Sequence, residues 1–159
     1  MFCGFGRWKK MNEKIKWCLS KKEGIMFVEP NENLSEEYRK EADNTLETML
    51  ETKGKWKIIM AYYSCYSALY SILIKAGIKC EIHSCSIALM GMIGFDKEDI
   101  KFMEKLKDDR TNVQYYLKEK ELEDENKVKE FLLKCKNIGN EIDVQMVMEK
   151  IRQVKNAKK

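Results

Sequence analysis

The sequence predicts an all-α protein, an up-and-down helical bundle of about five to six helices. The 159 residues include only one Pro and 8 Gly, too few turn residues for a β-sandwich or barrel. Hydrophobic residues make up 44% of the chain, enough for a core of ordinary size. A basic and aromatic tail over residues 1–10 is expected to precede one helical domain over residues 11–159.

The first two helices are predicted on either side of an extended connection. An amphipathic helix over residues 11–22 is expected to end at Gly24, and residues 25–33 then cross to the next helix. Asn33 and Glu36 resemble a capping box, so the second helix is expected to begin there and to end near Gly54. Its buried stripe is expected to contain Leu34, Tyr38, Ala42, Leu46, Met49 and Leu50.

The third helix, Trp56–Ala76, is expected to form the core because it is apolar nearly all round. Gly77 supplies the left-handed residue that ends it. The charge-free residues 58–74 reach the lower limit of a membrane span. Tyr and Ser hydroxyls lie all round this helix and would be unsatisfied in hydrocarbon. We therefore expect a helix buried among other helices, and no membrane contact.

Three further helices complete the predicted bundle. The fourth covers residues 82–92, and Asp96 is expected to cap the fifth. The stripe of the fifth helix is Met103, Leu106, Arg110, Val113 and Leu117. The last helix is expected to begin near Asp124 and to bury Val128, Phe131, Leu132, Cys135, Ile138 and Ile142.

Arg110 lies where the core face of the fifth helix calls for an apolar residue. A buried charge without a partner would cost several kcal/mol. One interpretation is a structural salt bridge, or a buried stem with its charged head at the surface. The other is an anion site for phosphate, at the edge of a cleft or at a dimer interface. The residues alone favour neither.

Charge and cysteine content bound the function further. Residues 1–22 carry seven basic residues against one acid, and residues 150–159 carry five bases and no acid. These basic ends are either solvated or bind RNA phosphates. The six Cys include no CxxC pair and His83 is the only histidine, so no metal site or cofactor is expected. We interpret the Cys as reduced thiols of a cytoplasmic protein.

Common catalytic motifs are absent from the chain. It contains no Gly-rich phosphate loop, no HExxH and no GxSxG. His83 is the only imidazole in the chain, and we therefore do not expect a triad of nucleophile and base.

Two segments, Trp56–Ser84 and Asp108–Tyr116, together resemble the central helix pair and the signature helix of HEPN domains. The resemblance implies an up-and-down bundle, usually dimeric. It also implies that His83 takes part in helix packing or N-terminal capping. Many HEPN domains are metal-independent RNases that act as toxins beside a nucleotidyltransferase-like antitoxin.

The family's nuclease motif is an Arg, an adjacent polar residue and a His about five positions later. In this chain the resemblance places the Arg at Arg110, the polar residue at Thr111, the His position at Tyr115 and the following Tyr at Tyr116. The motif His is absent, and a Tyr of ordinary pKa is a poor base at neutral pH. Residues 110 and 115 lie about 140° apart on an ideal helix, so they share a site only at a helix end or across a dimer interface.

The sequence leaves three functional hypotheses. The first is a degenerate RNase-type domain, related to toxin–antitoxin systems, that binds RNA or a nucleotide near Arg110. The second is a dimeric, non-enzymatic interaction module that partners a nucleotidyltransferase-like protein. The third is an active metal-independent RNase that uses Tyr115 in place of His. The apolar face with Tyr62, Tyr66 and Tyr70 predicts a homodimer.

Overall fold

The computed structural model describes residues 3–157, in which seven α-helices dominate. They are joined by one short 3-10 turn and two three-residue strands. The elements are α1 (Cys3–Ser20), β1 (Ile25–Phe27), α2 (Glu32–Glu51), α3 (Lys55–Lys75), β2 (Ile78–Cys80), α4 (His83–Ala88), η1 (Met90–Met92), α5 (Lys97–Gln114), α6 (Glu125–Glu141) and α7 (Val144–Asn156). The all-α prediction is confirmed, with slightly more helices than expected.

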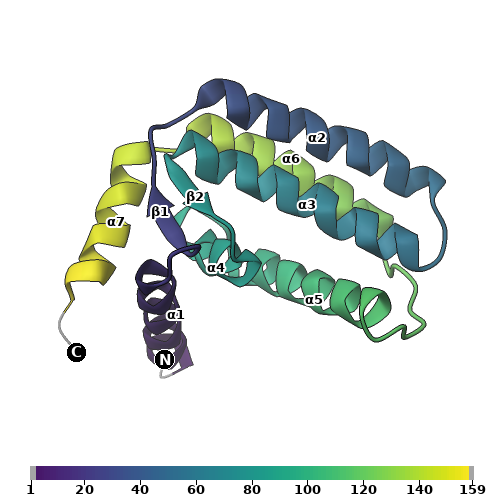
Figure 1. The fold of residues 1–159 in the computed structure, drawn as a ribbon, viewed down its shortest axis with the longest axis horizontal. Coiled ribbons are helices and arrows are strands. Elements are labelled where there is room, and N and C mark those ends of the chain that lie inside the picture. The colour runs from purple at the N-terminus through teal and green to yellow at the C-terminus, as the bar shows by residue number, and fades with distance from the viewer. Residues whose placement is uncertain (1–2, 158–159) are drawn as a thin grey trace.

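Helix α3 is the centre of the bundle, as its composition predicts. It packs against α2 and α6, which lie beside it, and against α5 on its other side (Figure 1). Its length and composition would also suit a membrane span, but 78% of that apolar window is buried inside the protein. Tyr62, Leu69 and Leu73 on this helix are completely inaccessible to solvent.

A small antiparallel sheet joins the N-terminal part of the chain to the end of α3. Ile25 of β1 lies opposite Cys80 of β2, and Phe27 lies opposite Ile78. Gly77 precedes β2 with φ of 77°, the left-handed conformation expected at this position. Strands of three residues are too short to show an alternating pattern, so hydrophobic periodicity does not predict them.

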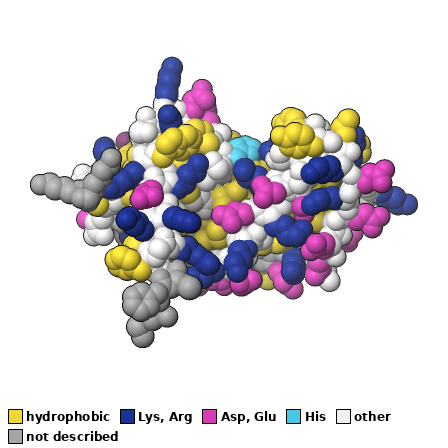
Figure 2. Space-filling model, turned by 90° about the horizontal axis from the view of Figure 1, so that it is seen from below, with side chains coloured by type: hydrophobic (Ala, Val, Ile, Leu, Met, Phe, Trp, Pro, Cys, Tyr) yellow, Lys and Arg dark blue, Asp and Glu magenta, His cyan; other side chains and the backbone are white. Residues whose placement is uncertain are grey.

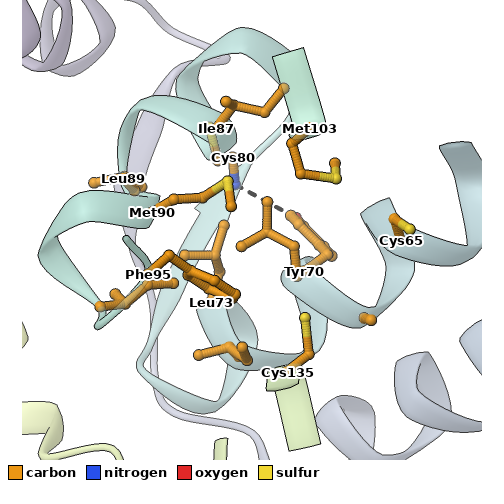
Figure 3. Close-up of a cluster of buried hydrophobic side chains, with 14 of the residues drawn as sticks. Cys65, Tyr70, Leu73, Cys80, Ile87, Leu89, Met90, Phe95, Met103 and Cys135 are labelled. Atoms are coloured by element: carbon orange, nitrogen blue, oxygen red, sulfur yellow. Dashed lines mark hydrogen bonds between the residues drawn. The ribbon is translucent and has the colours of Figure 1, made fainter. Parts of the chain in front are cut away.

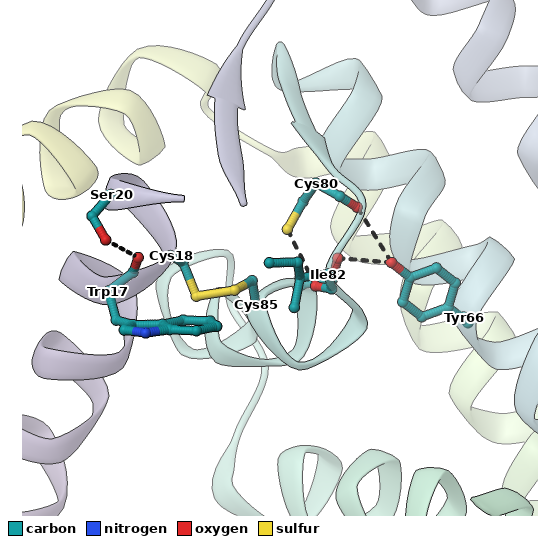
Figure 4. The surroundings of a disulfide bond; sticks show 8 residues. Trp17, Cys18, Ser20, Tyr66, Cys80, Ile82 and Cys85 are labelled. Atoms are coloured by element: carbon teal, nitrogen blue, oxygen red, sulfur yellow. Dashed lines mark hydrogen bonds between the residues drawn. A yellow bond between two sulfur atoms is a disulfide. The ribbon is translucent and has the colours of Figure 1, made fainter. Parts of the chain in front are cut away.

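Helix α1 begins at Cys3 rather than at Met11, so most of the predicted tail is helical. A disulfide between Cys18 and Cys85 joins α1 to α4 (Figure 4). The expectation that all Cys are reduced is therefore wrong for this pair. The two Cα atoms lie 5.8 Å apart although 67 positions separate them in sequence, a proximity that Cys spacing alone does not show.

The other thiols behave as expected for small apolar side chains. Cys65, Cys80 and Cys135 are buried and unpaired, and Figure 3 shows them among the core side chains. Burial raises the pKa of the Cys80 thiol, so it stays protonated at neutral pH. The side chain of Cys3 lies outside the described residues.

Several predicted boundaries need correction. Helix α2 is capped by Asn31, whose side chain accepts a hydrogen bond from the Leu34 amide, and not by Asn33. Leu34 and Leu50 are exposed rather than part of the buried stripe. Leu117 is also exposed, because α5 ends at Gln114 and Leu117 turns to a φ of 53°.

The sequence predicts one last helix beginning near Asp124, but the structure has two helices there, α6 and α7. The chain turns at Ile142, and Asp143 caps α7 by accepting a hydrogen bond from the Met146 amide. The expected starts of α5 and α6 are confirmed, with Asp96 and Asp124 as their N-caps. Lys158 and Lys159 of the predicted basic end lie outside the described residues.

Candidate functional site

Helix α5 places Arg110 on its buried face. The capping box formed by Asp96 and Asp99 fixes the start of this helix. Its inward stripe then runs through Met103, Leu106, Arg110 and Val113, all buried against α3 and its neighbours. Arg110 is only 9% exposed, so its charge is largely removed from water, as its position in the stripe predicts.

Tyrosine rings and two polar side chains surround the guanidinium. One terminal nitrogen donates to the Tyr63 hydroxyl at 3.2 Å and to the side-chain oxygen of Gln114 at 3.4 Å. The guanidinium carbon lies 4.7 Å from the ring centre of Tyr62, 5.6 Å from that of Tyr63 and 5.7 Å from that of Tyr115. We call Arg110, Tyr62, Tyr63, Tyr115 and the nearby His83 the Arg110 cluster.

Arg110 has no carboxylate partner among residues 3–157. Over residues 3–157, no Asp or Glu oxygen lies within 4.0 Å of its guanidinium, and its buried Nε has no hydrogen-bond acceptor. Its chain neighbour Asp109 instead binds Lys105 at 2.7 Å and Lys120 at 2.8 Å. Within the described part of the chain, the structure thus shows no salt bridge at Arg110. It shows a buried cation held by neutral groups, an arrangement that leaves its charge available to an added anion.

His83, the first residue of α4, lies beside the same tyrosine. Its Nδ1 and the Tyr62 hydroxyl form a hydrogen bond of 2.7 Å. Its ring stacks on Tyr66 with centres 3.9 Å apart, and the side chain is half-buried. Tyr62 therefore contacts the imidazole with its hydroxyl and the guanidinium with its ring face.

Positive charge gathers around the imidazole. Desolvation lowers the pKa of His83 below its ordinary value of 6.5, and the charges of Arg110 and Lys107 lower it further. Lys107, one turn before Arg110 on α5, likewise has no carboxylate oxygen within 4.0 Å in the part of the chain that the structure describes. The imidazole is consequently neutral at pH 7, and an anion bound here would meet three groups that carry or can carry positive charge.

The sequence did not place His83 with Arg110. Their positions are 27 apart, on different helices, and only the return of the chain through β2 to α4 brings the imidazole onto α3. His83 does pack against helix α3 as expected, but Ile82, not His83, is the N-cap of α4. The sequence signal that pointed toward this contact was the pair Tyr62 and Tyr66. Side chains four residues apart lie on the same face of a helix, so this face carries two polar rings.

Tyr62, Tyr66 and Tyr70 form a column of rings along α3. Successive ring centres are 5.9 Å apart, and burial raises the pKa of each hydroxyl. Tyr66 bonds Ser86 of α4 at 2.9 Å, and Tyr38 of α2 packs edge-on against Tyr70. Much of the face on which we based the expected homodimer is therefore covered within one chain.

The four residues singled out from the sequence occupy different surroundings. Tyr115 caps the C-terminal end of α5, which is how its ring reaches Arg110 despite the angle between the two positions. The hydroxyl of Thr111 donates to the Lys107 carbonyl of its own helix at 3.0 Å. Tyr116 is 69% exposed. The structure thus joins Arg110 with Tyr115, while among residues 3–157 the side chains of Thr111 and Tyr116 make no hydrogen bond or ring contact with the cluster.

The described residues include no group of three or more His, Cys, Asp or Glu arranged to hold a metal ion. Comparison of the sequence with protein-family models and with curated proteins gives no match. The chemistry of the Arg110 cluster is therefore the basis for a functional proposal.

Proposed function

We propose that the chain is a degenerate RNase-type domain of the HEPN kind that binds a phosphate of RNA or of a nucleotide at Arg110. One observation carries the proposal: the Arg110 guanidinium is buried without any carboxylate among the described residues. A structural arginine in such a position is ordinarily paired, because an isolated buried charge is costly. A bound phosphate would supply the missing negative charge through short, charge-assisted hydrogen bonds.

The surroundings of Arg110 suit an anionic ligand that enters from solvent. His83 is half-buried and Tyr115 is 64% exposed, so the cluster reaches the surface of the protein. The order of the two HEPN-like segments along the chain also supports the proposal. A second copy of the chain and a nucleotidyltransferase-like antitoxin belong to the same proposal as the family's usual setting. A cytoplasmic location is also proposed, and it rests on the free thiols of Cys65, Cys80 and Cys135.

Binding of 5′-AMP and of a fluorescent 12-nucleotide oligoadenylate at low salt tests this function. Arg110→Met keeps the apolar stem and removes the charge, and it is expected to weaken both ligands by at least about tenfold. Arg39→Met is the matched control, because Arg39 is a half-buried arginine on α2 that pairs with Glu36 at 3.4 Å. It should leave both affinities within about twofold of the parent's.

Failure to bind either ligand, or equal binding by Arg110→Met and the parent, would reject the phosphate site. A protein that binds neither ligand but captures a nucleotidyltransferase-like partner would instead be an interaction module.

RNA cleavage is a second candidate function, favoured by the contact of Tyr62 with both His83 and Arg110. The neutral imidazole would take the proton of a ribose 2′-hydroxyl. The 2′-oxygen would then form a bond to phosphorus while the bond to the 5′-oxygen breaks, and solvent would protonate that oxygen. The products are a 2′,3′-cyclic phosphate and a 5′-hydroxyl, and Arg110 would stabilise the charge on the phosphorane oxygens.

Gel analysis of the labelled oligonucleotide separates cleavage from binding. His83→Gln is expected to abolish cleavage while retaining RNA affinity, and Arg110→Met to abolish both. Tyr115→Phe should cleave as the parent does if His83 is the base, and should be inactive if Tyr115 is. A parent protein that binds RNA without cutting it would leave binding as the function.

A further inference from the structure

A groove of about 630 Å³ lies between α1, α4 and the first half of α5. Six basic side chains line its walls: Arg7, Lys10, Lys14, Lys97, Lys101 and Lys107. The three on α1 follow one another at steps of three and four residues, so they share one face of that helix. Figure 2 views the molecule from the side of α1 and α5, where Lys and Arg side chains (dark blue) are prominent.

Most of this positive charge has no carboxylate partner among the described residues. Of these residues, two carboxylates, Glu104 and Asp108, line the groove. Lys101 contacts Glu98 at 3.6 Å, while the other five cations have no carboxylate oxygen within 4.0 Å over residues 3–157. Such a surface attracts a polyanion, because each neutralised phosphate releases a condensed counterion.

The groove lies next to the Arg110 cluster. Lys107, which lines the groove, lies one turn before Arg110 on α5, and its charge also lowers the pKa of His83. Ser84, the residue after His83, lines the same groove. Met11 and Ile100, which are partly exposed, also line the groove and give nucleobases apolar surface to cover.

We infer that this groove holds the backbone of an RNA strand that has one phosphate at Arg110. The inference rests on the proposed function and narrows its ligand from any nucleotide to an RNA of several nucleotides. Helix α1 then acts as one wall of the binding site, held to α4 by the disulfide between Cys18 and Cys85 (Figure 4). This gives the basic N-terminal region a specific role in place of simple solvation.

The test compares a long and a short ligand at several salt concentrations. The groove variant carries Arg7→Gln, Lys10→Gln and Lys14→Gln. Its affinity for the labelled 12-nucleotide oligoadenylate should fall, and the slope of log K against log salt should become shallower by about 2, since each single-strand phosphate contact contributes about 0.7. Its affinity for 5′-AMP should stay within about twofold of the parent's, because Arg110 is unchanged.

A matched variant removes the same charge elsewhere. Lys53, Lys129 and Lys150 are exposed and do not line the groove, so their replacement by Gln should leave the salt slope unchanged. Circular dichroism and thermal unfolding of both triple variants establish that they fold.

The possible outcomes separate this inference from the proposed function. The inference is overturned if the groove variant binds the oligonucleotide with the parent's affinity and slope, or if an acidic peptide competes for the groove better than RNA does. If the parent binds 5′-AMP but shows no gain with the longer RNA, the groove fails while the phosphate site stands. If RNA binding depends on the groove cations but not on Arg110, the groove stands and the phosphate site fails.

Discussion

Replacement of Arg110 by Met should have little effect on the stability of the empty protein. The change removes hydrogen bonds to Tyr63 and Gln114 and the contacts with three tyrosine rings. It also removes a buried charge that has no counterion among the described residues. These two consequences act in opposite directions on the free energy of unfolding.

The magnitudes nearly cancel. Each hydrogen bond contributes about 0.5 to 1.5 kcal/mol, and the cation–π contacts add about 0.5 to 2 kcal/mol. Removing an uncompensated buried charge recovers several kcal/mol of desolvation. Met preserves most of the apolar stem, so it leaves only a small cavity. We therefore expect a net change within about 1.5 kcal/mol in either direction, whereas breaking a buried ion pair would cost about 3 to 5 kcal/mol.

Urea unfolding with and without ligand measures both parts of this prediction. At a 5′-AMP concentration of about ten times Kd, the parent should gain about 1.4 kcal/mol, and Arg110→Met should gain nothing. Arg39→Met serves as the control and should gain as much as the parent. A loss above about 3 kcal/mol in ligand-free Arg110→Met would refute the reasoning, because it would show that the empty protein already compensates this charge.

Three further predictions concern the framework around the site. Reduction of the disulfide between Cys18 and Cys85 should lower the free energy of unfolding by about 2 to 4 kcal/mol, because this bond closes a long loop. Urea unfolding with and without reductant measures the loss, and a loss below about 1 kcal/mol would contradict the prediction. Gly77→Ala should destabilise by at least about 2 kcal/mol, because φ is 77° and the added Cβ would lie 2.6 Å from a backbone oxygen. Gly139→Ala is its control, and there the new Cβ meets only ordinary contacts, so helix α6 should become more stable by up to about 1 kcal/mol. Because the pKa of His83 is lowered in the folded state, unfolding takes up protons below pH 6.5. Stability should therefore fall as pH drops from 6.5 through the folded-state pKa, and His83→Gln should flatten this part of the profile.

Helical periodicity predicted most of the fold because the bundle is built from long amphipathic helices. The core role of α3, the N-cap Asp96, the helix start near Asp124 and the left-handed Gly77 are all local properties of the sequence, and the structure confirms them. The two short strands and the disulfide between α1 and α4 were missed because they depend on contacts between distant segments.

In the candidate site, too, local sequence properties were predictable and contacts between distant segments were not. Arg110 was identifiable because its helix stripe puts a charge on a buried face, a pattern visible in one segment. His83 joins it only through tertiary structure, since Tyr62 of α3 contacts both α4 and α5. Thr111 was carried over by motif position, but its hydroxyl bonds its own helix. Motif spacing does not determine where a side chain points.

His83 is the only histidine, so its ring protons report on the Arg110 cluster without any label. An NMR titration of these protons, with and without 5′-AMP, is the most direct test of an anion site at Arg110. The free protein should give a pKa below 6.5, and bound 5′-AMP should raise it, because the phosphate charge stabilises the imidazolium. In Arg110→Met the ligand-free pKa should move up toward 6.5 and 5′-AMP should no longer change it. A pKa of His83 that is the same with and without saturating 5′-AMP in the parent protein would contradict the account.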